Sequence, residues 1–516
     1  MAAGADAPTD DAARRVRVLV FIVAYKAETT IRQVLTRIPA SLAEKYDVEV
    51  LVIDDSSDDR TFEHGELARR EGLIPFKLTV LFNPENQGYG GNQKIGFRYA
   101  IDRGFDIVAL VHGDGQYAPE RLPELLAPIA DGEADAVFGS RMLTPGGARR
   151  GGMPLYKFVG NKILTRYQNL VMGAHLSEWH SGYRVYATAA LRRIPFDLNA
   201  DVFHFDTEII IQLMLAGLRI REIAIPTFYG DEISRVNGMR YAWDVVKAVT
   251  SARLFRANLL YDHRFDCQPV DRASIAARRD RRYETMRAAA VALVQPGTRA
   301  IVLGNAGADI AEDLRARGVT VEELPLAAIV RRAEPDPLSP QGFTMAYAPL
   351  DFAGVDAVVM LDVIERVPSP ELFLAHLRRA ARFAPDVRLV VGCGNAGFLV
   401  TRLQQLLGHA TYGRGTIMNR GHLRLFTYAS LRRAFVQAAF RITSVRGLPA
   451  PFPIVFGDGV LAALLGAINR GLIAVRRSLF SHQLLLVAQP RRSLDHLLRE
   501  AERQSEARAA TIAGPN

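Results

Sequence analysis

Apolar runs and helical patterns alternate along the first half of the chain. Residues 16–24, VRVLVFIVA, are almost continuously apolar, as expected of a parallel strand that is buried on both faces. The runs VEVLVID, KLTVLFN, DIVALVH and ADAVFGS repeat this pattern, and helical patterns at 28–38, 60–71 and 91–103 separate the first four strands. This alternation predicts an α/β domain built on a parallel sheet.

A second alternation of the same kind begins near residue 297. It contains RAIVLGNAGADIAEDLRARG, DAVVMLDVIERV and DVRLVVGCG, and it ends with the predicted strand HQLLLVAQP. Residues 273–294 have a basic helical pattern and separate the two alternations. We therefore predict a disordered lead-in at 1–15, a first α/β domain at 16–262, a helical connector at 263–296, a second α/β domain at 297–489 and a charged tail at 490–516.

Polar residues gather at the ends of four predicted strands of the first domain. They lie at 24–25, 54–55, 83–87 and 112–116. Open α/β sheets bind their ligands outside the carboxyl ends of the strands. The pattern therefore predicts a ligand site at this edge of the first domain.

The composition favours an anionic partner. The 516 residues carry a formal net charge of +9, which suits a phosphate, a nucleotide or a membrane surface; a biased usage of arginine explains the charge equally well. Cys267 and Cys393 are the only cysteines, which excludes a disulfide framework and favours a reducing compartment. No stretch reaches the roughly 18 apolar residues of a membrane span. We expect a cytoplasmic protein that has no nucleic-acid partner. If it contacts a membrane, we expect this contact to be peripheral and at the inner face.

Six motifs of the first domain occur in one characteristic order. They are IVAYKAETTI, LVIDDSSDDRT, NQGYGGNQKIGFRYA, HGDGQYAPE, FGSR and HSGYR. In this order they resemble the family 2 glycosyltransferases of the GT-A fold, and in particular the branch that is similar to dolichyl-phosphate mannose synthase. The resemblance spans about residues 16–250. It implies an inverting hexosyltransferase that uses a nucleotide-sugar donor and serves the synthesis of cell-envelope glycans.

The turn after the fourth strand carries the candidate metal ligands. A nucleotide diphosphate leaving group has to be neutralised as its bond to the sugar breaks, and Mg²⁺ or Mn²⁺ held by oxygen ligands does this as a Lewis acid. Asp114 and Gln116 offer two such oxygens. The family often has an acidic residue where His112 stands, so the number of ligands stays open. The alternative is that Asp114 only forms the turn.

The resemblance assigns the donor pocket to the ends of the first three strands. It implies that Asp54 contacts the base or the ribose of the nucleotide, and that Glu28 is an acidic group of the pocket. The alternatives are an Asx turn at Asp54 and a charge at a helix N-terminus for Glu28. The glycines of NQGYGGNQ either let the backbone approach the donor or simply end a strand. The predicted donor-binding residues are Tyr25, Glu28, Asp54, Asp55 and Gly88.

The acceptor class decides which further residues are needed. A phosphate acceptor is already anionic and needs positive charge, which Arg141, Lys157, Lys162 and Arg184 offer. His180 stands where the polyprenyl-phosphate branch often has an acid. A sugar hydroxyl needs a general base instead, and Asp206 or Glu208 lies where relatives that glycosylate hydroxyls place it. We take Asp114, Arg184 and Asp206 as the candidate catalytic residues, and Arg141, Lys157 and Arg184 as the candidate ligands of an acceptor phosphate.

The helical pattern at 240–264 has two interpretations. Its apolar residues recur at helical spacing, with Arg253, Arg256 and Arg264 between them. It lies on an anionic bilayer, or it packs against the sheet or the second domain.

The second domain resembles a class I S-adenosylmethionine-dependent methyltransferase. The motifs LDVIERVPSPELFLAHLRRA and HLRLFTYASLRRAF carry this resemblance. In its loop VLGNAGAD, however, Ala306 and Ala308 stand where glycines are expected, and Val302 stands where an acid is usual. Because added methyl groups crowd the ligand, we expect S-adenosylmethionine to bind weakly or not at all, and a docking or regulatory role is an alternative to catalysis. GCGNAG at 392–397 imitates a dinucleotide fingerprint but lacks the acid that should follow about 20 residues later.

The favoured interpretation is a metal-dependent transferase that moves a sugar to polyprenyl phosphate or a related acceptor. One alternative is a bifunctional enzyme that glycosylates a saccharide hydroxyl and also methylates. A nucleotidylyltransferase is less favoured, because VAYKAETT lacks the glycine-rich loop with arginine of that class. A scaffold without activity is disfavoured by the presence of Asp54, Asp114 and Gln116.

Overall fold

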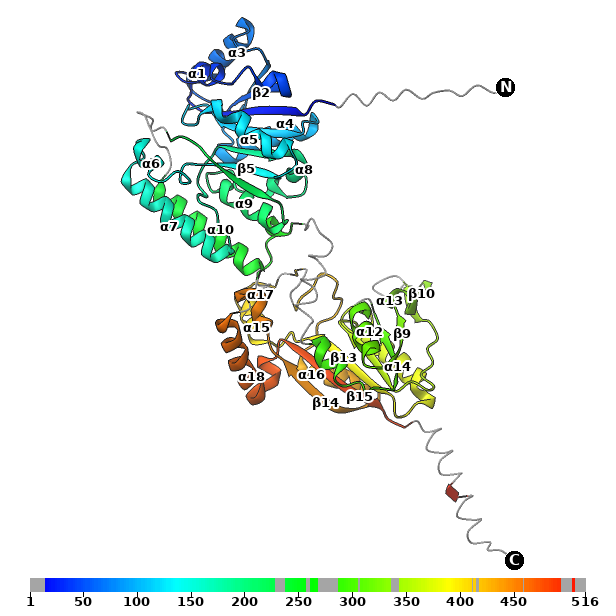
Figure 1. Cartoon of the computed structure of the whole chain (residues 1–516). Helices are drawn as coiled ribbons and strands as arrows, with labels where there is room; N and C mark the ends of the chain where they lie inside the picture. The colour runs from blue at the N-terminus through cyan, green and yellow to red at the C-terminus, as the bar shows by residue number, and fades with distance from the viewer. Residues whose placement is uncertain are drawn as a thin grey trace, which may run out of the picture. The chain divides into compact units, whose positions relative to one another are not determined.

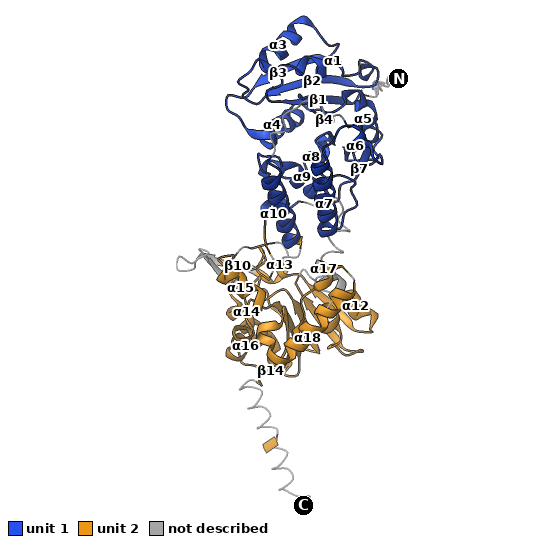
Figure 2. Ribbon diagram, turned by 90° about the vertical axis from the view of Figure 1, so that its left-hand side faces the viewer, with its two compact units in different colours: residues 1–255, 262–275 blue, residues 256–261, 276–516 orange. Residues whose placement is uncertain are grey.

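The chain forms two compact units (Figures 1 and 2), the first made of residues 1–255 and 262–275 and the second of 256–261 and 276–516. The computed structural model describes residues 14–227, 237–256, 260–267, 286–304, 307–335, 343–410, 412–413, 417–457, 459–492 and 504–505. Most of the predicted lead-in, connector and charged tail lies outside the described residues, as does Ala306.

The first unit contains a seven-stranded sheet with the order β3-β2-β1-β4-β6-β5-β7. Its strands are β1 (Arg17–Ala24), β2 (Asp47–Asp54), β3 (Lys77–Phe82), β4 (Ile107–His112), β5 (Ala136–Ser140), β6 (Arg184–Ala187) and β7 (Ile220–Ala224). The predicted α/β class is confirmed. The sheet is parallel from β3 to β4 and between β5 and β7, as expected, but β6, which the sequence did not predict, runs antiparallel between β4 and β5. β6 has only four residues, too few for a periodic pattern to predict.

Helices cover both faces of this sheet. They are α1 (Ile31–Thr36), α2 (Leu42–Lys45), α3 (Thr61–Glu71), α4 (Gly88–Asp102), α5 (Leu122–Ala130), α6 (Gly147–Arg150), α7 (Leu155–Met172), α8 (Thr188–Leu191), α9 (Phe205–Leu215) and α10 (Gly238–Arg256), with short 3-10 turns at Pro119–Arg121, Phe196–Leu198 and His263–Phe265. Thus α3 and α4 lie close to the predicted helices at 60–71 and 91–103, whereas the segment 28–38 becomes the shorter α1.

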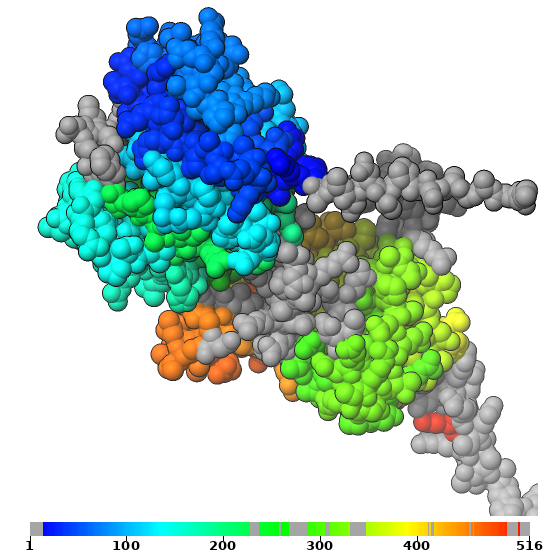
Figure 3. Space-filling view, turned by 45° about the horizontal axis from the view of Figure 1, so that its top comes forward, coloured from blue at the N-terminus to red at the C-terminus, as the bar shows by residue number. Residues whose placement is uncertain are grey.

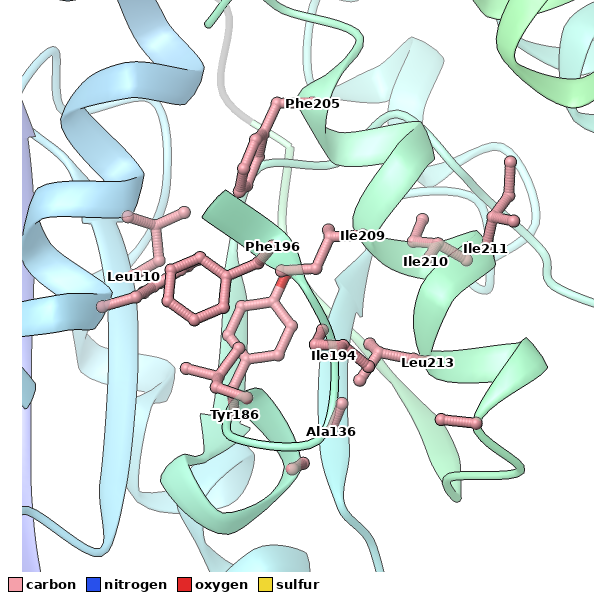
Figure 4. Packing of buried hydrophobic residues seen from close by; sticks show 14 of the residues in the cluster. Leu110, Ala136, Tyr186, Ile194, Phe196, Phe205, Ile209, Ile210, Ile211 and Leu213 are labelled. Carbon is pink, nitrogen blue, oxygen red and sulfur yellow. The ribbon is translucent and has the colours of Figure 1, made fainter. Parts of the chain in front are cut away.

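Two hydrophobic clusters lie on opposite faces of β1. Leu19 and Phe21 belong to the cluster that contains α4 and α9, and Val18 and Val20 belong to the cluster that contains α1 and α5. Figure 4 shows side chains of β4, β6 and α9 gathered in the first cluster. Each fully buried large apolar side chain stabilises the fold by about 1.5–3 kcal/mol. Burial on both faces explains why this strand is almost entirely apolar in sequence.

The second unit contains a six-stranded sheet with the order β14-β15-β13-β12-β8-β9. Its strands are β8 (Arg299–Leu303), β9 (Thr320–Leu324), β12 (Ala357–Leu361), β13 (Arg388–Gly394), β14 (Phe440–Leu448) and β15 (Gln483–Pro490), and β10 (Val330–Pro335) pairs separately with β11 (Phe343–Tyr347). β8, β9, β12 and β13 are parallel, whereas β14 and β15 form an antiparallel edge.

The helices of the second unit are distributed along its whole length. They are α12 (Gly307–Ala316), α13 (Leu326–Ile329), α14 (Pro370–Ala380), α15 (Leu399–Leu406), α16 (Tyr428–Gln437), α17 (Phe452–Phe456) and α18 (Val460–Phe480), with a 3-10 turn at Ala381–Phe383. Within the described residues of both units, we find no helix that combines the length and the apolar character needed to cross a membrane.

Candidate active site

The carboxyl ends of β1, β2 and β4 bring the predicted polar segments to one edge of the sheet. Ala24 pairs with Asp54, and Val23 pairs with His112, in the parallel register. The hydroxyl of Thr30 donates to the carbonyl of Gly113 at 2.6 Å, which ties the loop after β1 to the turn after β4. The strand register therefore places the segments that begin at Tyr25, Asp55 and Gly113 side by side.

Asp54 is the last residue of β2, and only one of its two carboxylate oxygens accepts hydrogen bonds from described residues. Its Oδ1 accepts hydrogen bonds from the backbone N–H and the hydroxyl of Ser57, so the predicted Asx turn is present. Its Oδ2 is buried and has no hydrogen-bond partner among the described residues. Burial raises the pKa of the Asp54 carboxyl above its ordinary value. One oxygen of this side chain thus holds the loop, and the other can accept a hydrogen bond from a ligand.

Asp55 and Glu28 hold neighbouring loops. Asp55 Oδ1 accepts from the Asn83 side chain and from the Gln87 backbone N–H, each at 2.8 Å. Glu28 Oε2 accepts from the backbone N–H of Arg60, the residue that caps α3, at 3.0 Å. This is the charge at a helix N-terminus that was the alternative interpretation of Glu28.

Gly88 and Tyr25 are the remaining predicted donor-binding residues. Gly88 begins α4 with φ at +77°, and a Cβ there would lie 2.5 Å from the carbonyl oxygen of Asp201. A glycine is therefore needed here for the packing of α4 against residue 201 of the same unit. Tyr25 lies at the sheet edge and is 43% exposed.

Asp114 and Gln116 lie on the exposed turn that follows β4. Asp114 Oδ1 accepts from the backbone N–H of Gln116 at 3.1 Å, and Gly115 between them has φ at +76°. The Asp114 carboxylate is exposed to solvent. The turn presents hard oxygen donors at the edge where the donor pocket is predicted, so these residues fit a Mg²⁺ or Mn²⁺ ion.

A hydrogen-bonded chain extends from β4 to α9. The Tyr89 hydroxyl donates to Asp206 Oδ2 at 3.0 Å and lies 3.2 Å from His112 Nε2. Because that hydroxyl has a single proton, His112 donates its Nε2–H to Tyr89, and Nδ1 carries the ring's lone pair. Burial lowers the pKa of His112. Burial and the negative charge of Asp206 raise the pKa of Tyr89.

Arg184 continues this chain and is only 1% exposed. Its Nη1 lies 3.5 Å from Asp206 Oδ1. All three guanidinium nitrogens donate to backbone carbonyls, of Ser181 at 2.7 Å, Trp179 at 3.0 Å and Asp206 at 3.0 Å. Each guanidinium nitrogen of Arg184 thus has a partner within the protein, and the side chain holds the start of α9 against β6.

Arg141 follows β5 at the same edge and forms a buried ion pair with Glu178. Its Nε lies 3.0 Å from Glu178 Oε1, and its backbone N–H donates to Oε2 at 2.8 Å. Although burial alone raises the pKa of Glu178, the charge and hydrogen bonds of Arg141 bring it below its ordinary value. Lys157 is half-buried on α7, and Lys162 on the same helix is exposed.

His180 lies close to this ion pair, where the related branch often has an acid. Its Nδ1 is 2.7 Å from the Tyr241 hydroxyl, and its Nε2 is buried without a hydrogen-bond partner among the described residues. Burial lowers the pKa of His180 to about 4. The acidic group in this region is supplied by Glu178, two positions earlier in the sequence.

Glu208 is the second candidate for a general base. It is fully buried, pairs with Arg264 and accepts from the backbone N–H of Ala200 at 2.7 Å. It links α9 to the segment after α10. Sequence reasoning did not identify Tyr89, Glu178 or Tyr241; Tyr89 and Glu178 lie within or beside the motifs NQGYGGNQ and HSGYR, and their position there was the only available signal.

Comparison with known proteins gives the family. The model described as "Glycosyl transferase family 2" matches residues 19–196. Undecaprenyl-phosphate mannosyltransferase of Micrococcus luteus is 31% identical over 225 residues, which cover 43% of this chain and 88% of the relative. The chain belongs to glycosyl transferase family 2. Polyprenol monophosphomannose synthase of Mycolicibacterium smegmatis is 28% identical over 226 residues. The alignment covers 43% of this family 2 glycosyltransferase and 82% of the relative.

The family match includes most of the candidate site of this glycosyltransferase. Asp54, Asp114, Arg141 and Arg184 lie within the matched residues 19–196, whereas Asp206 and the second unit lie beyond them. Among solved structures, glucosyl-3-phosphoglycerate synthase of Mycobacterium tuberculosis aligns with 46% of this chain and 80% of its own, with 19% identity and a TM-score of 0.36.

Proposed function

We propose that the first unit is a GT-A transferase that moves a sugar, with inversion, from a nucleotide-sugar donor to a polyprenyl or dolichyl phosphate. The acceptor class is supported by the names of the relatives in Micrococcus luteus and Mycolicibacterium smegmatis, and by a dolichyl-phosphate N-acetylglucosaminyltransferase of Methanococcus voltae that is 28% identical over 41% of this chain. The observation that carries the donor site is the meeting of Asp54, with its unpartnered Oδ2, and the Asp114 turn at one edge of the sheet.

The donor site uses two kinds of oxygen. Asp54 Oδ2 accepts a hydrogen bond from the base or the ribose of the nucleotide. Asp114 and Gln116 hold the Mg²⁺ or Mn²⁺ ion, which supplies positive charge to the departing diphosphate. Glu28 and Asp55 act indirectly, because their hydrogen bonds fix the loops on which the pocket depends.

The acceptor needs no general base if it is a phosphate. An anionic phosphate oxygen attacks the sugar carbon directly and has no proton to lose. Asp206 accepts from Tyr89 and Gln93 and pairs with Arg184, so its oxygens already have partners, and this favours the phosphate over a hydroxyl acceptor.

We assign different roles to the basic residues near the acceptor. Arg184 is a positioning residue, since it holds Asp206 and, through Tyr89, the ring of His112 two positions before Asp114. Arg141 and Lys157 remain the candidates for the acceptor phosphate. Arg141 is 8% exposed and follows β5 at the same edge as the donor residues.

With a lipid acceptor, the enzyme would act at the cytoplasmic face of a membrane. The element best suited to contact the bilayer is α18. Val460, Leu464 and Val475 are 88%, 56% and 82% exposed. The helix carries Arg470, Arg476 and Arg477 and no acidic residue. Part of the orange surface in Figure 3 belongs to this segment. Exposed apolar residues interleaved with arginines suit an anionic bilayer.

The helix predicted at 240–264 fits the packed interpretation better. Val245, Ala248, Val249 and Ala252 of α10 are buried within the first unit. The exposed apolar side chains at its start, of which Trp243 is 62% exposed, leave a smaller surface than that of α18.

For the second unit we propose a methyltransferase-like fold that has lost tight cofactor binding. Its parallel strands with an antiparallel edge support this fold. Gly304, the remaining loop glycine, has φ at +102°, and a Cβ there would lie 2.5 Å from Val363 Cγ2. Its packing against Val363 therefore explains this glycine without a bound ligand.

Replacement of Asp114 tests the metal-dependent transfer. Asp114→Asn removes the charge of an exposed ligand, so the transfer rate should fall by about 100-fold or more, since the metal contributes several kcal/mol. Asp197→Asn, which changes another exposed aspartate of the same unit, should leave the rate and the thermal midpoint unchanged. Near-normal turnover of Asp114→Asn, or full activity of the wild type in EDTA, would remove Asp114 from the ligands.

A further inference from the structure

Two acidic residues and a histidine converge in the second unit, at the carboxyl edge of its sheet. Asp362, Glu365 and His422 each offer one ligand atom, and these atoms lie within 4.8 Å of one another. Asp362 follows β12 directly, and its backbone N–H donates to Gly392 of β13 at 2.9 Å. The three residues belong to the unit outside the family match at 19–196 and take no part in the proposed sugar transfer.

Glu365 is the member of this cluster whose environment is incomplete. It is 1% exposed, and its Oε1 accepts from the backbone N–H of Gly394 at 2.8 Å. Its Oε2 is buried and has no hydrogen-bond partner among the described residues. A buried carboxylate oxygen without a partner is costly, because it has lost its contact with water. A cation beside Glu365 would remove this cost.

His422 is oriented as a metal ligand usually is. Its Nδ1 lies 3.1 Å from the carbonyl oxygen of Ile417, so Nδ1–H donates there. The Nε2 atom then faces Asp362 Oδ1 at 2.7 Å. Metal-bound histidines commonly donate their second ring N–H to a backbone carbonyl in this way, which fixes the ring.

Arg366 holds the other oxygen of Asp362. Its Nη2 lies 2.5 Å from Asp362 Oδ2, so Oδ1 is the oxygen on the side of His422. The backbone carbonyl of Glu365 accepts from Leu423 and Arg424 at 2.7 and 3.0 Å, which fastens the segment carrying His422 to the segment carrying both acids. Without an ion, the 2.7 Å contact between His422 Nε2 and Asp362 Oδ1 has to hold a proton, and a bound cation would take the place of that proton.

We propose that Asp362, Glu365 and His422 bind one divalent ion of the first transition row, such as Zn²⁺ or Mn²⁺. Two carboxylate oxygens and one imidazole nitrogen form a mixed donor set that suits these ions better than Ca²⁺. The ion joins β12, β13 and the segment around His422 at the edge where α/β sheets carry their sites. The alternative is a hydrogen-bonded network that fixes the same segments without an ion.

Calorimetry of the chelator-treated full chain tests this site. Titration with ZnCl₂ and with MnCl₂ should show one site that persists in Asp114→Asn, and binding should raise the thermal midpoint. Glu365→Gln should weaken binding at least tenfold and abolish the metal-dependent rise of the midpoint. Its midpoint in chelator should not fall, since the amide oxygen can still accept from Gly394 and Oε2 has no described donor to lose.

Two further variants complete this test. His422→Gln should weaken binding by a similar factor, which provides an independent result if Glu365→Gln does not fold. Glu371→Gln, an exposed glutamate at the start of α14, should bind the ion as the wild type does. Absence of binding in Asp114→Asn, or binding that neither Glu365→Gln nor His422→Gln weakens, would overturn the proposal without affecting the proposed sugar transfer.

Discussion

Two adjacent aspartates of the first unit, Asp54 and Asp55, have different roles because their carboxylates accept hydrogen bonds from different groups. Asp54 keeps one oxygen without a described partner at the sheet edge, whereas Asp55 Oδ1 joins Asn83 and Gln87. The sequence DD alone does not separate these tasks, since both residues are small, acidic and placed at a strand end. Hydrogen bonds from residues about 30 positions away decide which carboxylate remains for a ligand.

Asp54→Asn should weaken nucleotide binding while leaving the fold intact. In this variant the amide oxygen still accepts the hydrogen bonds from Ser57. The amide N–H₂ therefore takes the place of Oδ2, and a donor replaces an acceptor there. Loss of a hydrogen bond to a charged acceptor costs about 1.5–3 kcal/mol, which corresponds to about 10- to 100-fold in the dissociation constant. Calorimetry with UDP and GDP measures this change.

The control for this measurement lies at the other end of the same strand. Asp47→Asn changes an exposed carboxylate that pairs with Arg17, and its nucleotide affinity should equal that of the wild type. Equal affinity of Asp54→Asn and the wild type for both nucleotides would show that Oδ2 does not contact the donor.

At the scale of elements, the strands that carry the donor site could be predicted, whereas the contacts that join β6, α9 and α4 beside the acceptor residues could not. β1, β2, β3 and β4 are apolar runs followed by polar residues, and their parallel register follows from the alternation with helices. The chain of Arg184, Asp206 and Tyr89 joins β6, α9 and α4, which lie up to 117 positions apart. No periodicity or local motif records such a pairing, so its geometry required the structure.

The α18 surface gives a prediction that belongs to one helix. The full chain should bind vesicles containing anionic lipid, and Leu464→Gln with Ile468→Gln should reduce that binding about tenfold or more, because each buried large apolar side chain contributes about 1.5–3 kcal/mol. Co-sedimentation with vesicles of phosphatidylglycerol and phosphatidylcholine measures it. Leu372→Gln, at a residue of α14 that is 53% exposed, is the matched control. If the double variant binds as the wild type does, α18 does not contact the bilayer.

At the scale of the whole molecule, composition and periodicity predicted two α/β parts, because buried parallel strands leave long apolar runs in a sequence. β10 and β11, by contrast, contain polar and charged residues and have no such run. The cluster of Asp362, Glu365 and His422, for which we propose a metal ion, was also missed. Asp362 and His422 are 60 positions apart, and only folding brings them together.

The second unit should not bind S-adenosylmethionine with micromolar affinity. Val302 lies on β8 where an acid is usual, and Gly304 packs against Val363. Calorimetry of the full chain should therefore detect no binding, or binding with a dissociation constant above about 100 μM, which is a binding free energy of only about 5.5 kcal/mol. A micromolar dissociation constant would show that the loop accepts the cofactor despite its alanines, and it would revive the bifunctional alternative.

The most direct test of the central claim compares acceptors. The purified full chain is incubated with Mn²⁺, a panel of UDP- and GDP-sugars, and either undecaprenyl phosphate, undecaprenol or a set of oligosaccharides, and the sugar transferred to each is measured. We predict transfer to undecaprenyl phosphate and none to undecaprenol, because the phosphate oxygen is the nucleophile and Asp206 does not serve as a base. Transfer to undecaprenol or to a saccharide at a rate equal to or above that with undecaprenyl phosphate would contradict the account.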